Sequence, residues 1–193
     1  RLDRSLQELQ IAKPDVDFKT VSQELLAKNN LDQTDACVYI QVSRGAAPRK
    51  HAFPDPGTPP TVYAYAYPFK PDPKHLANGI STITVADLRW ARCDIKSIAL
   101  LPNCLARQQA REKGAEEALF VRDGAIIEGT HTSFCAVFGD TLHTHPDSPY
   151  LLPGVTRSVA LDLCDELGIP VQQFPILEHQ LKEADEFLVL GTT

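Results

Sequence analysis

A proline-rich run in the first half of the chain limits the folds that this sequence can adopt. Residues 68–73 read Pro-Phe-Lys-Pro-Asp-Pro. Proline fixes φ and lacks a backbone donor, so the run cannot hold a regular helix or an interior strand. We therefore expect a linker here, with a small domain over residues 1–68 and a larger one over 74–193. A chain of 193 residues, 43% of them hydrophobic, can bury one large core or two modest ones.

Hydrophobic periodicity predicts helices and strands on both sides of this run. The first part is predicted to hold helices at 1–11 and 20–29 and strands at 36–43 and 61–67. The second part is predicted to hold strands at 80–88, around Lys96, within a hairpin region at 118–139, at 171–175 and at 187–190, and helices at 103–113, 156–167 and 178–182. Strands and helices mix without strict alternation, which favours an α+β or pseudo-barrel arrangement over a doubly wound parallel sheet.

Composition excludes several classes of protein. The formal net charge of −6 is spread along the chain without a basic stripe, so nucleic acid is not an expected partner. No apolar run approaches the roughly 20 residues of a membrane span. Five cysteines without a Cys-x-x-Cys pair argue against a zinc site and favour a reducing cytoplasm. His143 and His145 lack a third ligand at a suitable spacing, so we expect no metal.

Lys96 stands in the apolar run Ile95–Leu101. A lone lysine in such a run is usually a strand residue that keeps its ammonium in water. Burial on both faces would instead favour the neutral amine, the form that a covalent nucleophile requires. Glu128 also has an ordinary interpretation, as a carboxylate in water at a hairpin end, because Asp123-Gly124 is typical of a tight turn. Neither residue alone identifies an active site.

The segment Arg92-Cys93-Asp94-Ile95-Lys96-Ser97, followed by Glu128-Gly129, resembles the active-site region of the fold-type IV pyridoxal-phosphate (PLP) enzymes, the class IV aminotransferases. The amino-acid sequence of this segment is most similar to that of the D-amino acid aminotransferases. The resemblance implies a two-domain fold with PLP at the domain interface. It also implies that Lys96 carries PLP and acts as general acid and base, while Glu128 keeps the pyridine nitrogen protonated.

Three further segments resemble the family's phosphate site. Leu2-Asp3-Arg4-Ser5-Leu6 is similar to a helix start whose arginine binds the phosphate, which implies that role for Arg4. The segment 152–157 is similar to a loop entering a helix, where the backbone of Val155 and the hydroxyl of Thr156 would bind the phosphate. A helix N-terminus suits an anion, although Thr156 could equally be a plain helix cap. The last of the three, 190–193, implies a further ligand, Thr192.

The substrate end of the site is implied by Arg49-Lys50-His51. Arginine, one residue and histidine match the D-amino acid enzymes, where the pair helps to bind the substrate carboxylate, a role suited to a guanidinium fork. The ordinary alternative is a basic surface loop, since Lys50 interrupts the pair and prolines flank it.

The chain departs from the family in three ways. The sequence begins inside an amphipathic helix and contains no Met, so we expect the family's N-terminal strands, with a tyrosine of the carboxylate site, to be missing. The last strand stops three residues before the end, so we expect the closing strands and final helix to be missing too. His131 stands among residues that are usually small and hydroxylated, and we expect it to alter the cofactor's surroundings.

The leading hypothesis is a homodimeric enzyme that transfers the amino group of a D-amino acid, of the D-alanine or D-glutamate type, to a 2-oxo acid. A rival within the same fold is a branched-chain or (R)-amine transaminase, or an aminodeoxychorismate lyase. A third hypothesis, from another class, is a truncated remnant without catalytic activity.

Overall fold

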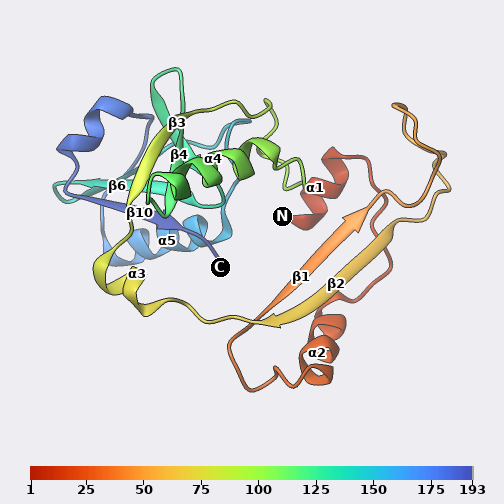
Figure 1. Ribbon diagram of the computed structural model, residues 1–193. Helices are drawn as coiled ribbons and strands as arrows, with labels where there is room; N and C mark the ends of the chain where they lie inside the picture. Colours follow the sequence, from red (N-terminus) through yellow and green to blue (C-terminus); the bar gives the residue numbers. More distant parts are fainter. Residues whose placement is uncertain (193) are drawn as a thin grey trace. The chain divides into compact units, whose positions relative to one another are not determined.

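The chain forms two compact units in the computed structural model, which describes residues 1–192. Unit 1 is Arg1–Pro73 and unit 2 is Lys74–Thr192, and Figure 1 follows both along the sequence. The proline-rich run therefore ends where the division falls.

Unit 1 is built on a two-stranded antiparallel sheet. β1 (Ala36–Ser43) pairs along its whole length with β2 (Thr61–Pro68). Helix α2 (Phe18–Lys28) packs against both strands, and α1 (Leu2–Glu8) precedes it. The Asp17 carboxylate starts α2 by accepting the Lys19 and Thr20 amides at 3.0 and 3.3 Å, because the first amides of a helix need an acceptor outside it.

Unit 2 contains two four-stranded sheets. The first has the order β3-β4-β5-β9 and the second the order β10-β6-β7-β8. The first sheet is formed by β3 (Thr82–Ala86), β4 (Glu117–Arg122), β5 (Ala125–Gly129) and β9 (Ile176–Leu177). The second is formed by β6 (Ser133–Phe138), β7 (Thr141–Thr144), β8 (Val171–Gln173) and β10 (Glu186–Leu190). The helices are α3 (Pro73–Asn78), α4 (Leu101–Glu112), α5 (Val155–Leu167) and the 3-10 helix η1 (Glu178–Glu183).

The main core of unit 2 lies between these two sheets. Leu119 and Ile126 of the first sheet meet Phe134 and Ala136 of the second. Helix α4 covers the other face of the first sheet, where its alanines contact Ala118 and Phe120 of β4. Helix α5 packs against the second sheet, and Figure 1 shows both helices beside their sheets. Because both faces of β4 are covered, four successive residues, 117–120, are buried.

The tight turn predicted at Asp123-Gly124 is confirmed. Both residues have positive φ, 51° and 78°, as a two-residue hairpin between antiparallel strands requires. This turn joins β4 to β5, so that β5 runs back toward the start of β4 and ends at Glu128 and Gly129. The mixed, mainly antiparallel pairing agrees with the α+β prediction.

The strand predicted around Lys96 is wrong. Residues 87–100 form turns and irregular backbone between β3 and α4. The apolar run was expected to be buried on both faces, but Ile98 and Leu101 are 70% and 72% exposed. Pro102 lies in the first turn of α4, where it is tolerated, so the run ends at the start of a helix instead of extending a strand. Among residues 1–192, no helix has both the length and the apolar character to cross a bilayer.

Candidate functional site

The loop between β7 and α5 joins several of the predicted site residues of unit 2. The Pro149 carbonyl accepts the Cys93 and Asp94 amides at 2.8 and 3.4 Å, just before Lys96 in the sequence. Three residues further on, the Leu152 amide donates to Glu128 Oε2 at 3.1 Å. The loop then enters α5 at Gly154. Segments far apart in the sequence, those of Lys96, Glu128 and Thr156, are therefore tied to one loop.

Lys96 is an exposed residue at the end of an anchored segment. Cys93, Asp94 and Ile95 are all buried, and the Asp94 carboxylate accepts Arg92 Nε at 3.0 Å. The prediction that Lys96 is buried is wrong. Ile95 is the last buried residue of the segment, and Lys96, the next residue, is exposed. The anchoring fixes the backbone of this lysine while leaving its side chain accessible.

Glu128 is a buried carboxylate at the end of β5, with 7% of its surface exposed. One oxygen is paired with Arg89 Nη1 and the other accepts the Leu152 amide. Burial raises the pKa of Glu128 above its ordinary value, although the charge of Arg89 opposes the shift. A carboxylate with a raised pKa, held by fixed donors, is suited to share a proton with a basic ring nitrogen.

Arg89 is a site residue that the sequence did not reveal. Its guanidinium also donates to Asp87 at 2.9 and 3.0 Å and to the Tyr150 carbonyl at 3.0 Å, and it lies 4.1 Å from the centre of the Phe120 ring. Arg122 Nε donates to the same Asp87 at 3.1 Å. Burial raises the pKa of Asp87, but the hydrogen bonds and charge of Arg89 outweigh it, so the pKa lies below its ordinary value.

This cluster gave only a weak signal in the sequence. Asp87 and Arg89 follow a predicted strand, but arginine and aspartate occur again at positions 92 and 94. The sequence spacing does not show which of the two Asp–Arg pairs is buried next to Glu128.

The start of α5 has the features of an anion site. Gly154 is the N-cap and no side chain caps the helix, so its first amides have no intrahelical acceptor. Thr156 Oγ1 lies 3.4 Å from Thr192 Oγ1, although 36 residues separate them. A Cβ on Gly154 would lie 2.4 Å from Ser133 Oγ. Since φ of Gly154 is an ordinary −76°, glycine is needed here for close approach and not for an unusual turn.

The remaining predicted site residues lie in unit 1. Arg4 is an exposed residue of α1, and Arg49 and His51 are exposed residues of the loop between β1 and β2. The structure therefore brings Glu128, Val155, Thr156 and Thr192 together with the Lys96 segment inside unit 2. Arg4, Arg49 and His51 belong to the other unit.

His131 lies in the turn that follows Glu128 and Gly129. Its Nδ1 is 3.1 Å from Oε2 of Glu117, and its side chain is 52% exposed. Glu117, on β4, is almost fully buried and was not singled out from the sequence. Among the residues described, no three His, Cys, Asp or Glu side chains gather as a possible metal site.

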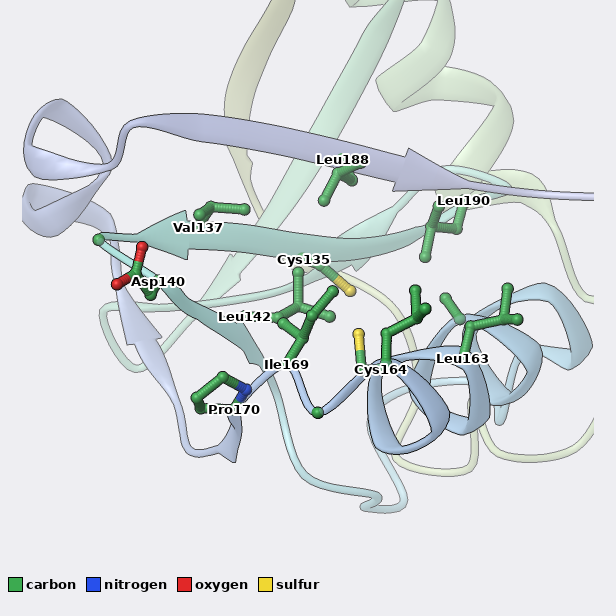
Figure 2. Close-up of a pocket in the computed structure, with 14 residues that line it drawn as sticks. Cys135, Val137, Asp140, Leu142, Leu163, Cys164, Ile169, Pro170, Leu188 and Leu190 are labelled. Carbon is green, nitrogen blue, oxygen red and sulfur yellow. The ribbon is translucent and has the colours of Figure 1, made fainter.

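A separate groove of about 610 Å³ opens between α5 and the second sheet. Figure 2 shows its apolar walls, with Leu163 and Cys164 on α5 facing Cys135 and Leu190 on the strands. None of the predicted site residues lines it, and Asp140 is the one charged residue among those that do. We therefore locate the candidate site around the 149–156 loop and not in this groove.

Comparison with known proteins identifies the family. The family model for amino-transferase class IV matches residues 1–193. The chain is 38% identical over 179 residues to a D-alanine aminotransferase from Bacillus licheniformis, covering 93% of this chain and 62% of that enzyme.

Solved structures show the same fold. The branched-chain amino acid aminotransferase of Escherichia coli has a TM-score of 0.86 at 24% identity, with 99% of this chain and 65% of that chain covered. A putative 4-amino-4-deoxychorismate lyase from Legionella pneumophila has the same TM-score at 22% identity, with 100% and 71% covered. The predicted resemblance and the predicted α+β fold are confirmed, and the chain belongs to the class IV aminotransferases.

Proposed function

We propose that this protein is a PLP-dependent transaminase that moves the amino group of a D-amino acid, of the D-alanine or D-glutamate type, to a 2-oxo acid. The observation that carries the proposal is the 149–156 loop, whose backbone binds the Lys96 segment and Glu128 before it enters α5. The 38% identity to a D-alanine aminotransferase supports the choice of substrate. The chain spans about 62% of that relative's length.

The residues of unit 2 fit PLP. The uncapped start of α5, with the hydroxyls of Thr156 and Thr192 3.4 Å apart, offers donors to a phosphate. A Cβ on Gly154 would lie 2.4 Å from Ser133 Oγ, so the residue before Val155 has no room for a side chain. Glu128 offers a buried carboxylate to a pyridine nitrogen. PLP, when bound, would supply the electron sink that stabilises a carbanion at the substrate α-carbon.

Each residue then has a defined task. Lys96 Nζ would hold the cofactor, and its amine would move a proton from and to the substrate α-carbon. Glu128 would keep a proton on the ring nitrogen, and Arg89 holds Glu128 in place. Arg4 adds a positive charge for the phosphate. We assign PLP binding to residues 74–193 and the small domain to 1–68.

Arg49 and His51 are proposed to receive the substrate carboxylate. Both are exposed on the loop between β1 and β2, and a guanidinium can bind a carboxylate through two parallel hydrogen bonds. Only one enantiomer of an amino acid can place its carboxylate there and its α-hydrogen toward Lys96.

We also propose a cytoplasmic homodimer. The five cysteines are all free thiols, which suits a reducing compartment. Four large apolar side chains between β3 and the middle of α4 are 63–81% exposed: Leu88, Ile98, Leu101 and Leu105. Exposed apolar residues gathered in one segment are typical of an interface, and we assign this one to a second copy of the chain.

The substrate assay tests the proposal directly. Full-length protein loaded with PLP should transaminate D-alanine or D-glutamate and discriminate against the L-enantiomers. Arg49→Ala should weaken activity on D-amino acids more than on an amine without a carboxylate, by the roughly 1.5–3 kcal/mol of a charged hydrogen bond. Lys50→Ala, at the neighbouring exposed position, is the matched control. A preference for L-leucine, for (R)-1-phenylethylamine or for lyase chemistry would replace the assignment, and no turnover at all would favour the remnant.

A further inference from the structure

The turn between β5 and β6 connects two parts of the site. Strand β5, which carries Glu128, ends on one side of this turn, and β6 begins at Ser133 on the other side. The Gly129 amide donates to the Thr132 carbonyl at 2.8 Å, which closes the turn. Ser133 Oγ in turn lies against Gly154 at the start of α5. The conformation of residues 129–132 therefore contributes, together with the Leu152 amide, to the spacing between the buried carboxylate and the helix N-terminus.

Glu117 fills the inside of this turn. Its Oε1 accepts the Thr130 amide at 3.2 Å and the Thr130 hydroxyl at 2.5 Å. Its Oε2 accepts the Thr132 hydroxyl at 2.9 Å and lies 3.1 Å from His131 Nδ1. The residue is 1% exposed. One buried carboxylate thus binds three successive residues of the turn.

The turn has little room to adopt another conformation. A Cβ on Gly129 would lie 2.1 Å from Thr132 Oγ1 and 3.0 Å from Glu117 Oε2. On its other side, Asn103 of α4 donates to the Thr130 carbonyl at 2.7 Å. Arg107 of α4 lies 3.6 Å from Glu117 Oε1 and supplies a positive charge. The carboxylate is therefore held between the turn and α4.

We propose that Glu117 is a positioning residue of the active site, which holds the 129–132 turn and thereby fixes Glu128 relative to the phosphate-binding start of α5. This inference rests on the proposed function. Glu117 touches neither end of the cofactor in this scheme and acts only through the turn. His131 adds an imidazole contact to the same carboxylate.

Variants of Glu117 separate positioning from general stability. The Ala118 amide also donates to Glu117 Oε1, at 2.8 Å. Glu117→Ala leaves the Thr130 and Ala118 amides and two hydroxyls without their acceptor, whereas Glu117→Gln keeps an oxygen for both amides. Thr132→Val removes one contact and leaves the carboxylate intact. Glu116→Gln makes the same chemical change at the adjacent residue, whose side chain is 52% exposed, and is the control.

The first measurement is hydrogen exchange of the 129–133 amides in cofactor-free protein. We expect protection to fall in Glu117→Ala, to fall less in Thr132→Val, and to be largely recovered in Glu117→Gln. The second is PLP affinity by titration, which should weaken about 10–100-fold in Glu117→Ala, the range seen when an outer partner of a ligand is removed. In the full-chain holoenzyme kcat should fall while KM for D-alanine stays unchanged.

Unchanged protection and unchanged PLP affinity in both Glu117→Ala and Thr132→Val would overturn the inference. So would a loss of stability in Glu117→Ala that leaves the PLP affinity of the folded fraction unchanged, because that result describes a merely structural residue. Absence of PLP binding by the unaltered protein would instead overturn the proposed function. The exchange measurement, made without cofactor, still decides whether Glu117 holds the turn.

Discussion

At the scale of single residues, the site depends on buried charges that neutralise one another. Arg89 is shared by Asp87 and Glu128, and all three side chains are less than 10% exposed. Removing the arginine leaves Glu128 buried without its cation and leaves Asp87 with Arg122 alone, which costs more than the pair contributed. We expect Arg89→Ala to lower the free energy of unfolding by about 3–5 kcal/mol, measured by urea denaturation.

The control for Arg89 is Arg111→Ala on an exposed position of α4, which should change stability by no more than about 0.5 kcal/mol. Equal effects of the two substitutions would contradict the assigned role of Arg89.

Glu128→Gln tests the carboxylate itself. The amide oxygen can still accept from Arg89, but the amide nitrogen then faces the Leu152 N–H, and the negative charge is lost. We expect PLP to remain bound and the half-reaction with a D-amino acid to slow by about 10²–10⁴-fold, measured in single turnovers. An unchanged single-turnover rate would remove Glu128 from the site.

Ionisation of Glu117 makes the free energy of unfolding depend on pH in the acid range. Burial opposes its ionisation, but the hydrogen bonds of His131 and Thr130 outweigh burial and lower the pKa of Glu117 to about 2. Because the folded pKa lies below the ordinary 4.5, the stabilisation is complete above about pH 4.5 and is lost as the pH falls toward 2. Glu117→Gln should flatten this part of the stability profile by up to about 3 kcal/mol. If the stability of Glu117→Gln falls with pH as steeply as that of the unaltered protein, the role assigned to Glu117 is contradicted.

At the scale of elements, the start of α5 is the feature that can be tested most directly. Gly154→Ala places a Cβ 2.4 Å from Ser133 Oγ, while φ of −76° lets alanine keep the helix start. We expect weaker PLP binding with little loss of helix content, and recovery in the double variant Gly154→Ala with Ser133→Ala, which removes the clashing oxygen. Gly57→Ala, with nothing within 4 Å of the added atom, is the control for both measurements. No recovery in the double variant would show that the clash is not the cause.

The sequence predicted most elements because their patterns are local. Strand β1 at 36–43 has the predicted bounds, and the Asp123-Gly124 turn follows from backbone chemistry. The segment around Lys96 failed because an apolar run of seven residues reads the same way in a buried strand and in an exposed loop that enters a helix. Arg89 and Glu117 were missed because their partners, Glu128 and Thr130, lie 39 and 13 residues away. Pairing over such distances is set by the register of the sheet, which no local pattern reveals.

At the scale of the whole molecule, the exposed apolar segment of unit 2 predicts self-association. Leu88, Ile98, Leu101 and Leu105 would otherwise leave a large apolar area in water. We expect a homodimer by light scattering and a shift toward monomer in Leu105→Glu, because glutamate suits a helix but not an apolar interface. Leu76→Glu, at a position of α3 that is 94% exposed, is the control and should leave the dimer intact. Lys96 lies between Leu88 and Ile98 in this segment. Dissociation of the dimer at low protein concentration should therefore also lower activity. A monomer that is fully active at that concentration would contradict the assignment.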